Sequence, residues 1–178
     1  SMVTSEFPEM KFAQRIYFGG LIDVPDQMGE TKAQGSAIGF GIDLLSGNHD
    51  EINRMNIPSS LKTGRLPENR NEVLLSKAFS DKLSLNPGDT LTLISSSMYG
   101  ELTLYNFILC GTVEFGTTAL DRGTIIADIR DVREALNMED ATGEILGFFP
   151  FQQYDDDKAG LVAGRFNQLF YSPDDEFS

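Results

Sequence analysis

Histidine and cysteine, which most often carry acid–base and nucleophilic chemistry near neutral pH, each occur once in this sequence. His49 lies in the polar segment 47–50, and Cys110 ends the apolar run 107–110. A Ser-His-Asp or Cys-His site needs a base within hydrogen-bond reach of its nucleophile, and no G-x-S-x-G motif is present. We interpret His49 as an exposed loop residue and Cys110 as a buried small hydrophobic residue. The sequence therefore predicts no nucleophilic catalytic site.

Metal ligands are equally sparse. Zinc requires clustered His and Cys ligands, which one residue of each type cannot supply. The acids Asp155, Asp156 and Asp157 could donate oxygens to calcium, although EF-hand spacing is absent. The alternative is that they begin a helix over 155–170, where carboxylates stabilise the positive end of the helix dipole. Capping needs fewer assumptions, and we predict no metal and no cofactor.

Phosphate-binding glycine motifs are also missing. Neither G-x-x-x-x-G-K-[ST] nor G-x-G-x-x-G occurs, so this chain is not the ATP-hydrolysing component of a transporter. Its 27 acidic residues leave a third interpretation open, in which two carboxylates meet in a cleft and hydrolyse a substrate. No pair of acids is singled out by the sequence. We predict that the protein is not an enzyme.

The net charge of the chain excludes some classes of binding partner. The formal net charge is −13, which repels nucleic acid phosphates and anionic lipid surfaces, so we expect no nucleic acid partner. The 178 residues are 40% hydrophobic and 23% charged, as in ordinary globular proteins. This length is enough for one domain or two small subdomains with a real core. No apolar run approaches the 18 residues of a membrane span.

Hydrophobic periodicity predicts an α+β fold with mixed and antiparallel sheets. Strands are expected at 14–22, with a break at Gly19-Gly20, and at 36–42, 72–75, 90–95, 102–115, 124–127 and 144–151. Residues 23–35 are expected to form a surface loop, and 90–95 to pair with 102–109 as an antiparallel hairpin. Helices are expected at 50–55, after Ser76, at 129–137 with Asp128 as the cap, and at 155–170. We predict one domain with two subdomains. A split β-α-β-like subdomain would comprise about 12–58 plus 116–171, and an inserted β-rich subdomain about 59–115. The acidic segment 172–178 is expected to be a disordered tail.

Two strands have unusual patterns. In the second, Gly39 and Gly41 alternate with apolar residues, so either another element packs closely against the bare face or the strand bends. In the last, the phenylalanines Phe148, Phe149 and Phe151 lie almost side by side. Adjacent strand residues point to opposite faces. Either the strand is covered on both sides, or these aromatic side chains form part of a partner surface.

One succession of turns carries a resemblance. The motif G-R-L-P at 64–67 is followed by an acidic strand at 72–75, a short helix, the turn P-G-D-T at 87–90 and another strand. This order resembles the extracytoplasmic core domain of MacB/LolC/FtsX-type ABC transporter permeases. The segment G-I-D at 41–43, the strand exit 108–116 and the helix 128–136 resemble that family too. These motifs form turns and caps, and none is catalytic.

The resemblance implies a domain on the periplasmic side of the cell inner membrane, between two transmembrane helices of a permease. Its partners would be its own transmembrane helices, a second permease subunit, a separate cytoplasmic ATP-binding subunit or domain, and a lipoprotein, peptide or periplasmic protein. The domain would contact cargo or partners and couple ATP-driven motion to export or lipoprotein release. The alternative is a stand-alone periplasmic or secreted ligand-binding domain.

Overall fold

The computed structural model describes residues 10–138, 144–148, 160, 162, 164 and 165. The chain divides into two compact units, one formed by residues 13–146 and the other by residues 1–12 and 147–178. The subdomain boundaries predicted near residues 58 and 115 stay a prediction. The expected tail at 172–178 and most of the expected helix at 155–170 lie outside the described residues.

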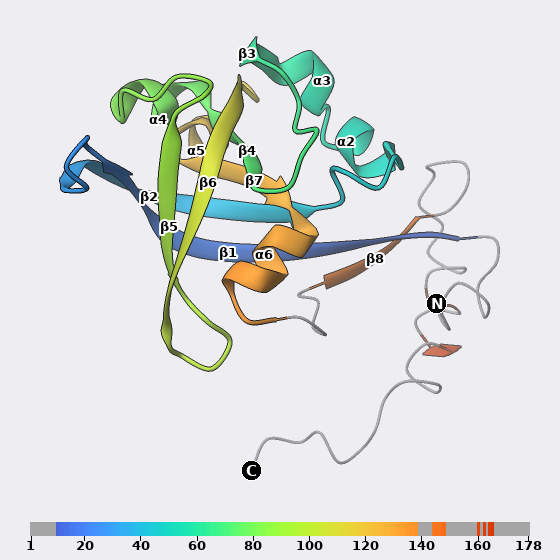
Figure 1. Ribbon diagram of the computed structural model, residues 1–178. Helices are drawn as coiled ribbons and strands as arrows, with labels where there is room; N and C mark the ends of the chain where they lie inside the picture. Colours follow the sequence, from blue (N-terminus) through green and yellow to red (C-terminus); the bar gives the residue numbers. More distant parts are fainter. Residues whose placement is uncertain (1–9, 139–143, 149–159, 161, 163, 166–178) are drawn as a thin grey trace. The chain divides into compact units, whose positions relative to one another are not determined.

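Six strands of the larger unit close into a ring (Figure 1). Its order is β1, β2, β7, β4, β6, β5 and back to β1, because β1 pairs with both β2 and β5. The pairs β2–β7 and β4–β6 are parallel, and the other pairs in the ring are antiparallel. The strands are β1 (Lys11–Pro25), β2 (Thr31–Ile42), β4 (Glu72–Ser76), β5 (Thr90–Ser96), β6 (Leu102–Val113) and β7 (Thr124–Asp128).

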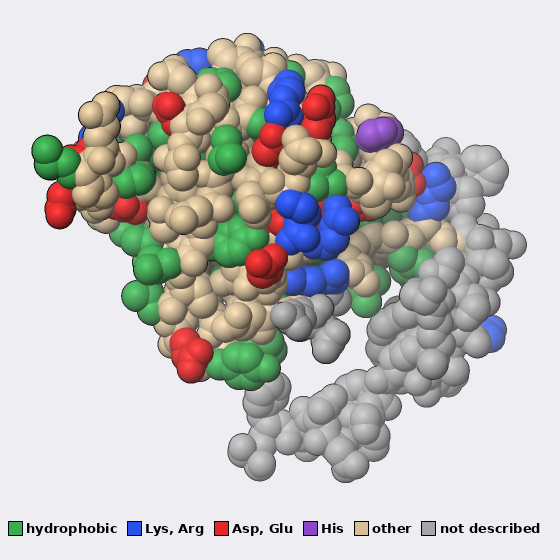
Figure 2. Space-filling view, viewed as in Figure 1, with side chains coloured by type: hydrophobic (Ala, Val, Ile, Leu, Met, Phe, Trp, Pro, Cys, Tyr) green, Lys and Arg blue, Asp and Glu red, His purple; other side chains and the backbone are tan. Residues whose placement is uncertain are grey.

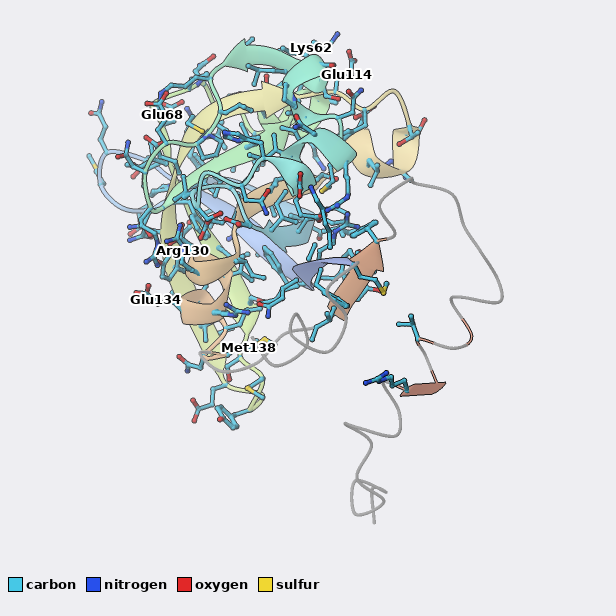
Figure 3. All side chains as sticks on the ribbon, turned by 90° about the vertical axis from the view of Figure 1, so that its right-hand side faces the viewer. Lys62, Glu68, Glu114, Arg130, Glu134 and Met138 are labelled. Atoms are coloured by element: carbon cyan, nitrogen blue, oxygen red, sulfur yellow. The ribbon has the colours of Figure 1, made fainter. Side chains whose placement is uncertain are left out.

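Two further strands extend this sheet. β3 (Leu61–Gly64) pairs with the end of β6, where the ion pair between Lys62 and Glu114 measures 2.8 Å (Figure 3). β8 (Glu144–Phe148) follows β1 in the sheet order, and in the smaller unit Gly147 lies beside Phe12. The mixed sheet with few helices confirms the predicted α+β class.

Short helices connect the strands. They are α2 (Asp50–Arg54), α3 (Ile57–Ser60), α4 (Lys77–Lys82), α5 (Thr118–Asp121) and α6 (Ile129–Ala135). Asp128 caps α6, because its carboxylate accepts the N–H of Arg130 at 3.0 Å. The predicted helices at 50–55, after Ser76 and at 129–137 are confirmed. The helices α3 and α5, each only four residues long, were not predicted from periodicity.

Apolar side chains form two clusters that follow the strand alternation. Val73 and Leu75 belong to the main cluster inside the ring, which also takes in α4 and α6. Leu74, between them, points outward into a second cluster that packs with Ile52 of α2 and Ile57 of α3. One part of the outer surface of the ring is therefore covered by helices, and the core fills the inside.

The glycines of β2 are explained by close packing. A Cβ on Gly39 would overlap the ring of Phe18, and one on Gly41 would lie 3.0–3.3 Å from the side chain of Val132. Phe18 and Val132 occupy the space that larger residues on β2 would need. Of the two alternatives raised by the sequence, the close approach of other elements is confirmed.

Two predictions about the first hairpin were wrong. The strand does not break at Gly19-Gly20, because β1 continues through both residues to Pro25. The expected surface loop 23–35 is also shorter, since β1 and β2 stay paired from Val24 and Ala33 inward and leave only a short turn. Asp26 closes that turn by accepting the N–H groups of Met28 and Glu30. The predicted antiparallel pairing of 90–95 with 102–109 is confirmed.

Candidate functional surface

The histidine and the cysteine, which could carry acid–base or nucleophilic chemistry, lie in different environments. His49 is exposed in the loop before α2. Cys110 is buried, and its thiol donates to the carbonyl of Val73 at 3.2 Å. Burial raises the pKa of this thiol to about 12, which leaves it protonated and unreactive near neutral pH. Within the described residues, no three His, Cys, Asp or Glu side chains are grouped to hold a metal ion.

The G-R-L-P motif forms an electrostatic clamp. Gly64 has φ of +72°, and it lies so close to the backbone of Cys110 that no side chain would fit. Arg65 binds both carboxylate oxygens of Glu72, and the same carboxylate accepts the N–H groups of Glu68 at 2.8 Å and Asn69 at 3.1 Å. The hydrogen bond from Arg65 holds the pKa of Glu72 well below its usual value. The role of the motif is structural.

A second network joins the loop after this motif to α6. Arg70 forms an ion pair with the buried Asp131 and another with Glu134, the latter at 2.9 Å. The N–H of Asn71 donates to Asp131 at 2.8 Å, and Tyr105 donates to the Asn71 side chain at 2.7 Å. In Figure 3, Arg130 and Glu134 lie on α6, whereas Lys62 and Glu114 lie at a distant part of the same unit. Arg130 forms an ion pair with Asp128 at 2.8 Å, so both Arg70 and Arg130 have acidic partners.

The P-G-D-T segment forms the predicted turn. Gly88 has φ of +104°, and its N–H donates to the carbonyl of Leu109 at 2.7 Å. The Asp89 carboxylate accepts the N–H of Asn86 at 2.8 Å. These bonds align β5 with β6. Like the Arg65–Glu72 clamp, this turn has a structural role, which accounts for the P-G-D-T motif.

Large apolar side chains are instead exposed on and beside the β5–β6 hairpin. Met98 and Tyr99 are exposed at its turn, and Figure 2 shows hydrophobic side chains gathered at that end. The turn is fixed in place, since the N–H of Met98 donates to the carbonyl of Leu136 at the end of α6 at 3.1 Å. Leu102 and Leu104 continue the exposed group along β6. Sequence reasoning missed these residues.

The predicted partner surface of phenylalanines is only partly described. Phe148 is half-buried at the end of β8. Phe149, Phe151 and the acids 155–157 lie outside the described residues. A partner role for Phe148, Phe149 and Phe151 therefore stays a prediction.

Comparison of the structure with solved proteins identifies a similar fold. The periplasmic region of MacB from Actinobacillus actinomycetemcomitans matches with a TM-score of 0.57 and 15% sequence identity. The match covers 89% of this chain and 66% of that chain. This chain has a fold like that of the MacB periplasmic region. Scanned against models of protein families, the sequence matches none, and no curated protein matches it.

The MacB-like fold confirms the resemblance that the turn motifs indicated. The chain spans about two thirds of the MacB periplasmic region, at 66% of its length. No helix in the part of the chain that the structure describes is long and apolar enough to cross a membrane. At 15% identity, the similarity establishes the fold, and the activity, cargo and partners of MacB are not carried over by it.

Proposed function

We propose that this chain is the periplasmic domain of an ABC transporter permease. The observation that carries the proposal is the MacB-like fold over 89% of the chain, found for a sequence whose turn motifs had indicated the same family. The described residues support a binding role, because their ion pairs serve the fold and their exposed apolar side chains suit contact with another molecule. The proposed domain performs no chemistry.

In this proposal the domain lies between membrane helices of a permease, and a separate ATP-binding domain drives their movement. The periplasmic domain passes that movement to a lipoprotein, a peptide or a periplasmic partner protein. The two networks at Glu72 and Asp131 support this role, because they tie loops to the ring of strands.

The parent gene gives the first test. We expect an apolar run of about 20 codons on each side of the segment for residues 1–178, the length of a membrane helix. We also expect a reading frame, or a further domain, with the motif G-x-x-x-x-G-K-[ST] for ATP binding. A signal peptide upstream and a stop codon directly downstream would contradict the proposal and favour a free ligand-binding domain.

Coupling can be tested on the full transporter in lipid nanodiscs. Met28 is 90% exposed, so Met28→Cys gives a site for a spin label, whereas the native Cys110 is buried. We expect the distance between labels on two subunits to differ between the ATP-bound and ADP-bound transporter. Identical distance distributions, in a transporter that still hydrolyses ATP, would show that the domain does not follow the nucleotide cycle.

A further inference from the structure

The outer surface of the ring has two halves of different character. Outside β4, β7 and the second half of β6, the apolar residues are covered by α2 and α3. Outside β1, β2, β5 and the first half of β6, large apolar residues are exposed. Leu102 is 73% exposed, Leu104 65%, Ile38 57% and Tyr17 49%.

Strand register shows that these residues share one face, which we call the bare face. Tyr17 pairs with Phe40, and their rings meet edge to face at 5.5 Å. Ile38 pairs with Gly19, and Ser96 with Leu102. Leu21, Ile94 and Leu104 follow one another across three strands. The bare face comprises Tyr17, Gly19, Leu21, Ser36, Ile38, Phe40, Ile94, Ser96, Leu102 and Leu104.

None of these ten positions carries a charge, and the next residue on the same side of β1 is Asp23, which pairs with Gln34 and Thr92 and belongs to the rim. The bare face is also uneven. An added Cβ at Gly19 would meet no atom within 4 Å, so the surface is open between Tyr17, Leu21 and Ile38. A protruding apolar side chain of a partner would find space there. Strands lie about 4.8 Å apart and an α-helix is about 10 Å wide, so one helix would cover two or three of these strands.

The charges around the bare face favour a basic partner. Asp23, Asp26 and Glu30 lie at the β1–β2 end, and Glu101 lies beside Leu102. The described bases beside the bare face are Lys32, Arg122, which precedes the Gly123 that lies against Ser36, and Arg15, which is paired with Glu51 at 2.6 Å. The four acids outnumber these bases. A second copy would bring the same acids against each other, and an anionic membrane would repel a chain of net charge −13.

We infer that the bare face binds an amphipathic helix of a partner protein, with an apolar stripe on the strands and basic side chains against the acidic rim. On the other half of the ring, α2 and α3 already pack on the strands in this way. The partner helix would complete the cover of the ring. This inference does not depend on the transporter proposal, because a free binding domain could use the same surface.

The probe is a fluorescent 14-residue peptide of leucine and lysine, with leucines at i, i+3, i+4 and i+7. Its binding to the purified chain is followed by anisotropy. We expect Leu104→Ser and Ile38→Ser each to weaken binding by about tenfold, which corresponds to the loss of one well-packed apolar contact. Ile145→Ser is the matched control, since Ile145 is 40% exposed on β8 and belongs neither to the bare face nor to its acidic rim, and it should bind as the wild type does.

Two control peptides separate apolar docking from charge attraction. A peptide with serine in place of leucine keeps the basic charge and loses the apolar stripe. A peptide with glutamate in place of lysine keeps the apolar stripe and reverses the charge. We expect both to bind much more weakly than the leucine–lysine peptide. Equal binding by the serine peptide, or unchanged binding by both bare-face variants, would overturn the inference. Two other results would also overturn the inference. If the wild type forms a dimer that Leu104→Ser abolishes, the bare face binds a second copy. If the wild type binds phosphatidylcholine vesicles and Leu104→Ser does not, the bare face binds a membrane.

Discussion

Arg65 and Glu72 form a two-point ion pair, in which Nη1 donates to Oε2 at 2.8 Å and Nη2 donates to Oε1 at 2.5 Å. The carboxylate also holds two backbone N–H groups, whereas the guanidinium is exposed. We therefore expect Glu72→Ala to lower the melting temperature more than Arg65→Ala does, since it leaves those N–H groups without their acceptor. Thermal unfolding followed by circular dichroism measures both. A larger loss with Arg65→Ala would contradict this assignment.

The same pair predicts a pH dependence. Glu72 has its pKa lowered by Arg65 from an ordinary value of 4.5, so its charged form stabilises the folded state above about pH 4.5. That contribution is lost as the pH falls further, because the unfolded chain takes up the proton first. We expect the melting temperature difference between wild type and Glu72→Gln to be largest above pH 4.5 and to shrink steadily below it. A difference that grows in acid would contradict the sign.

Asp128 joins two elements that are distant in sequence. Besides capping α6, its carboxylate accepts the N–H groups of Leu44 at 3.1 Å and Leu45 at 3.2 Å. Losing a helix cap and leaving buried N–H groups unsatisfied should reduce the free energy of unfolding by about 2–4 kcal/mol in Asp128→Ala. Urea denaturation measures the loss. Asp128→Asn keeps an acceptor and should lose less, and equal losses in the two variants would count against the hydrogen-bonding role.

Glycine at position 39 is required by packing. Gly39→Ala forces its Cβ into the ring of Phe18, and overpacking of this kind typically costs about 1–3 kcal/mol. Gly19→Ala, on the neighbouring strand, is the matched control because its Cβ would meet open space. We expect urea unfolding to show a clear loss for Gly39→Ala and no loss for Gly19→Ala. Similar stability of the two variants would mean that Phe18 adapts.

Cys110 should be unreactive toward thiol reagents in the folded protein. Its burial and its raised pKa, about 12, both reduce the fraction of accessible thiolate at pH 8. We expect Ellman's reagent to leave the native chain unlabelled and to modify one thiol per chain after unfolding in urea. Rapid labelling without urea would show that the second apolar cluster opens readily around this residue.

The sequence predicted most of the fold because local signals agreed with the final packing. Alternation identified β5, apolar runs identified β4 and β6, and Asp128 marked the start of α6. The two wrong predictions concern β1, where Gly19-Gly20 looked like a break. Both glycines are instead held in a strand that pairs with β2, and long-range pairing outweighed local preference.

The candidate surface was harder to predict for a related reason. Leu102 and Leu104 look like core residues in the sequence, and only the register that directs Tyr105 and Phe107 inward shows that they point outward. The ion pairs of Arg65 and Arg70 also depend on chain folding, since their partners lie on other elements. The motifs identified the turns, but the hydrogen bonds and ion pairs that stabilise those turns involve residues that only the fold brings close.

The closed ring also determines how this chain can reach its native state. Its parallel pair β2–β7 joins Ile38 to Thr124, and its closure joins Leu21 of β1 to Ile94 of β5. Neither contact forms until long intervening segments have been ordered, and the loss of chain entropy precedes the gain from pairing. Folding should therefore be slow and limited by ring closure, and the β5–β6 hairpin, whose strands are neighbours in sequence, is the natural place for it to begin.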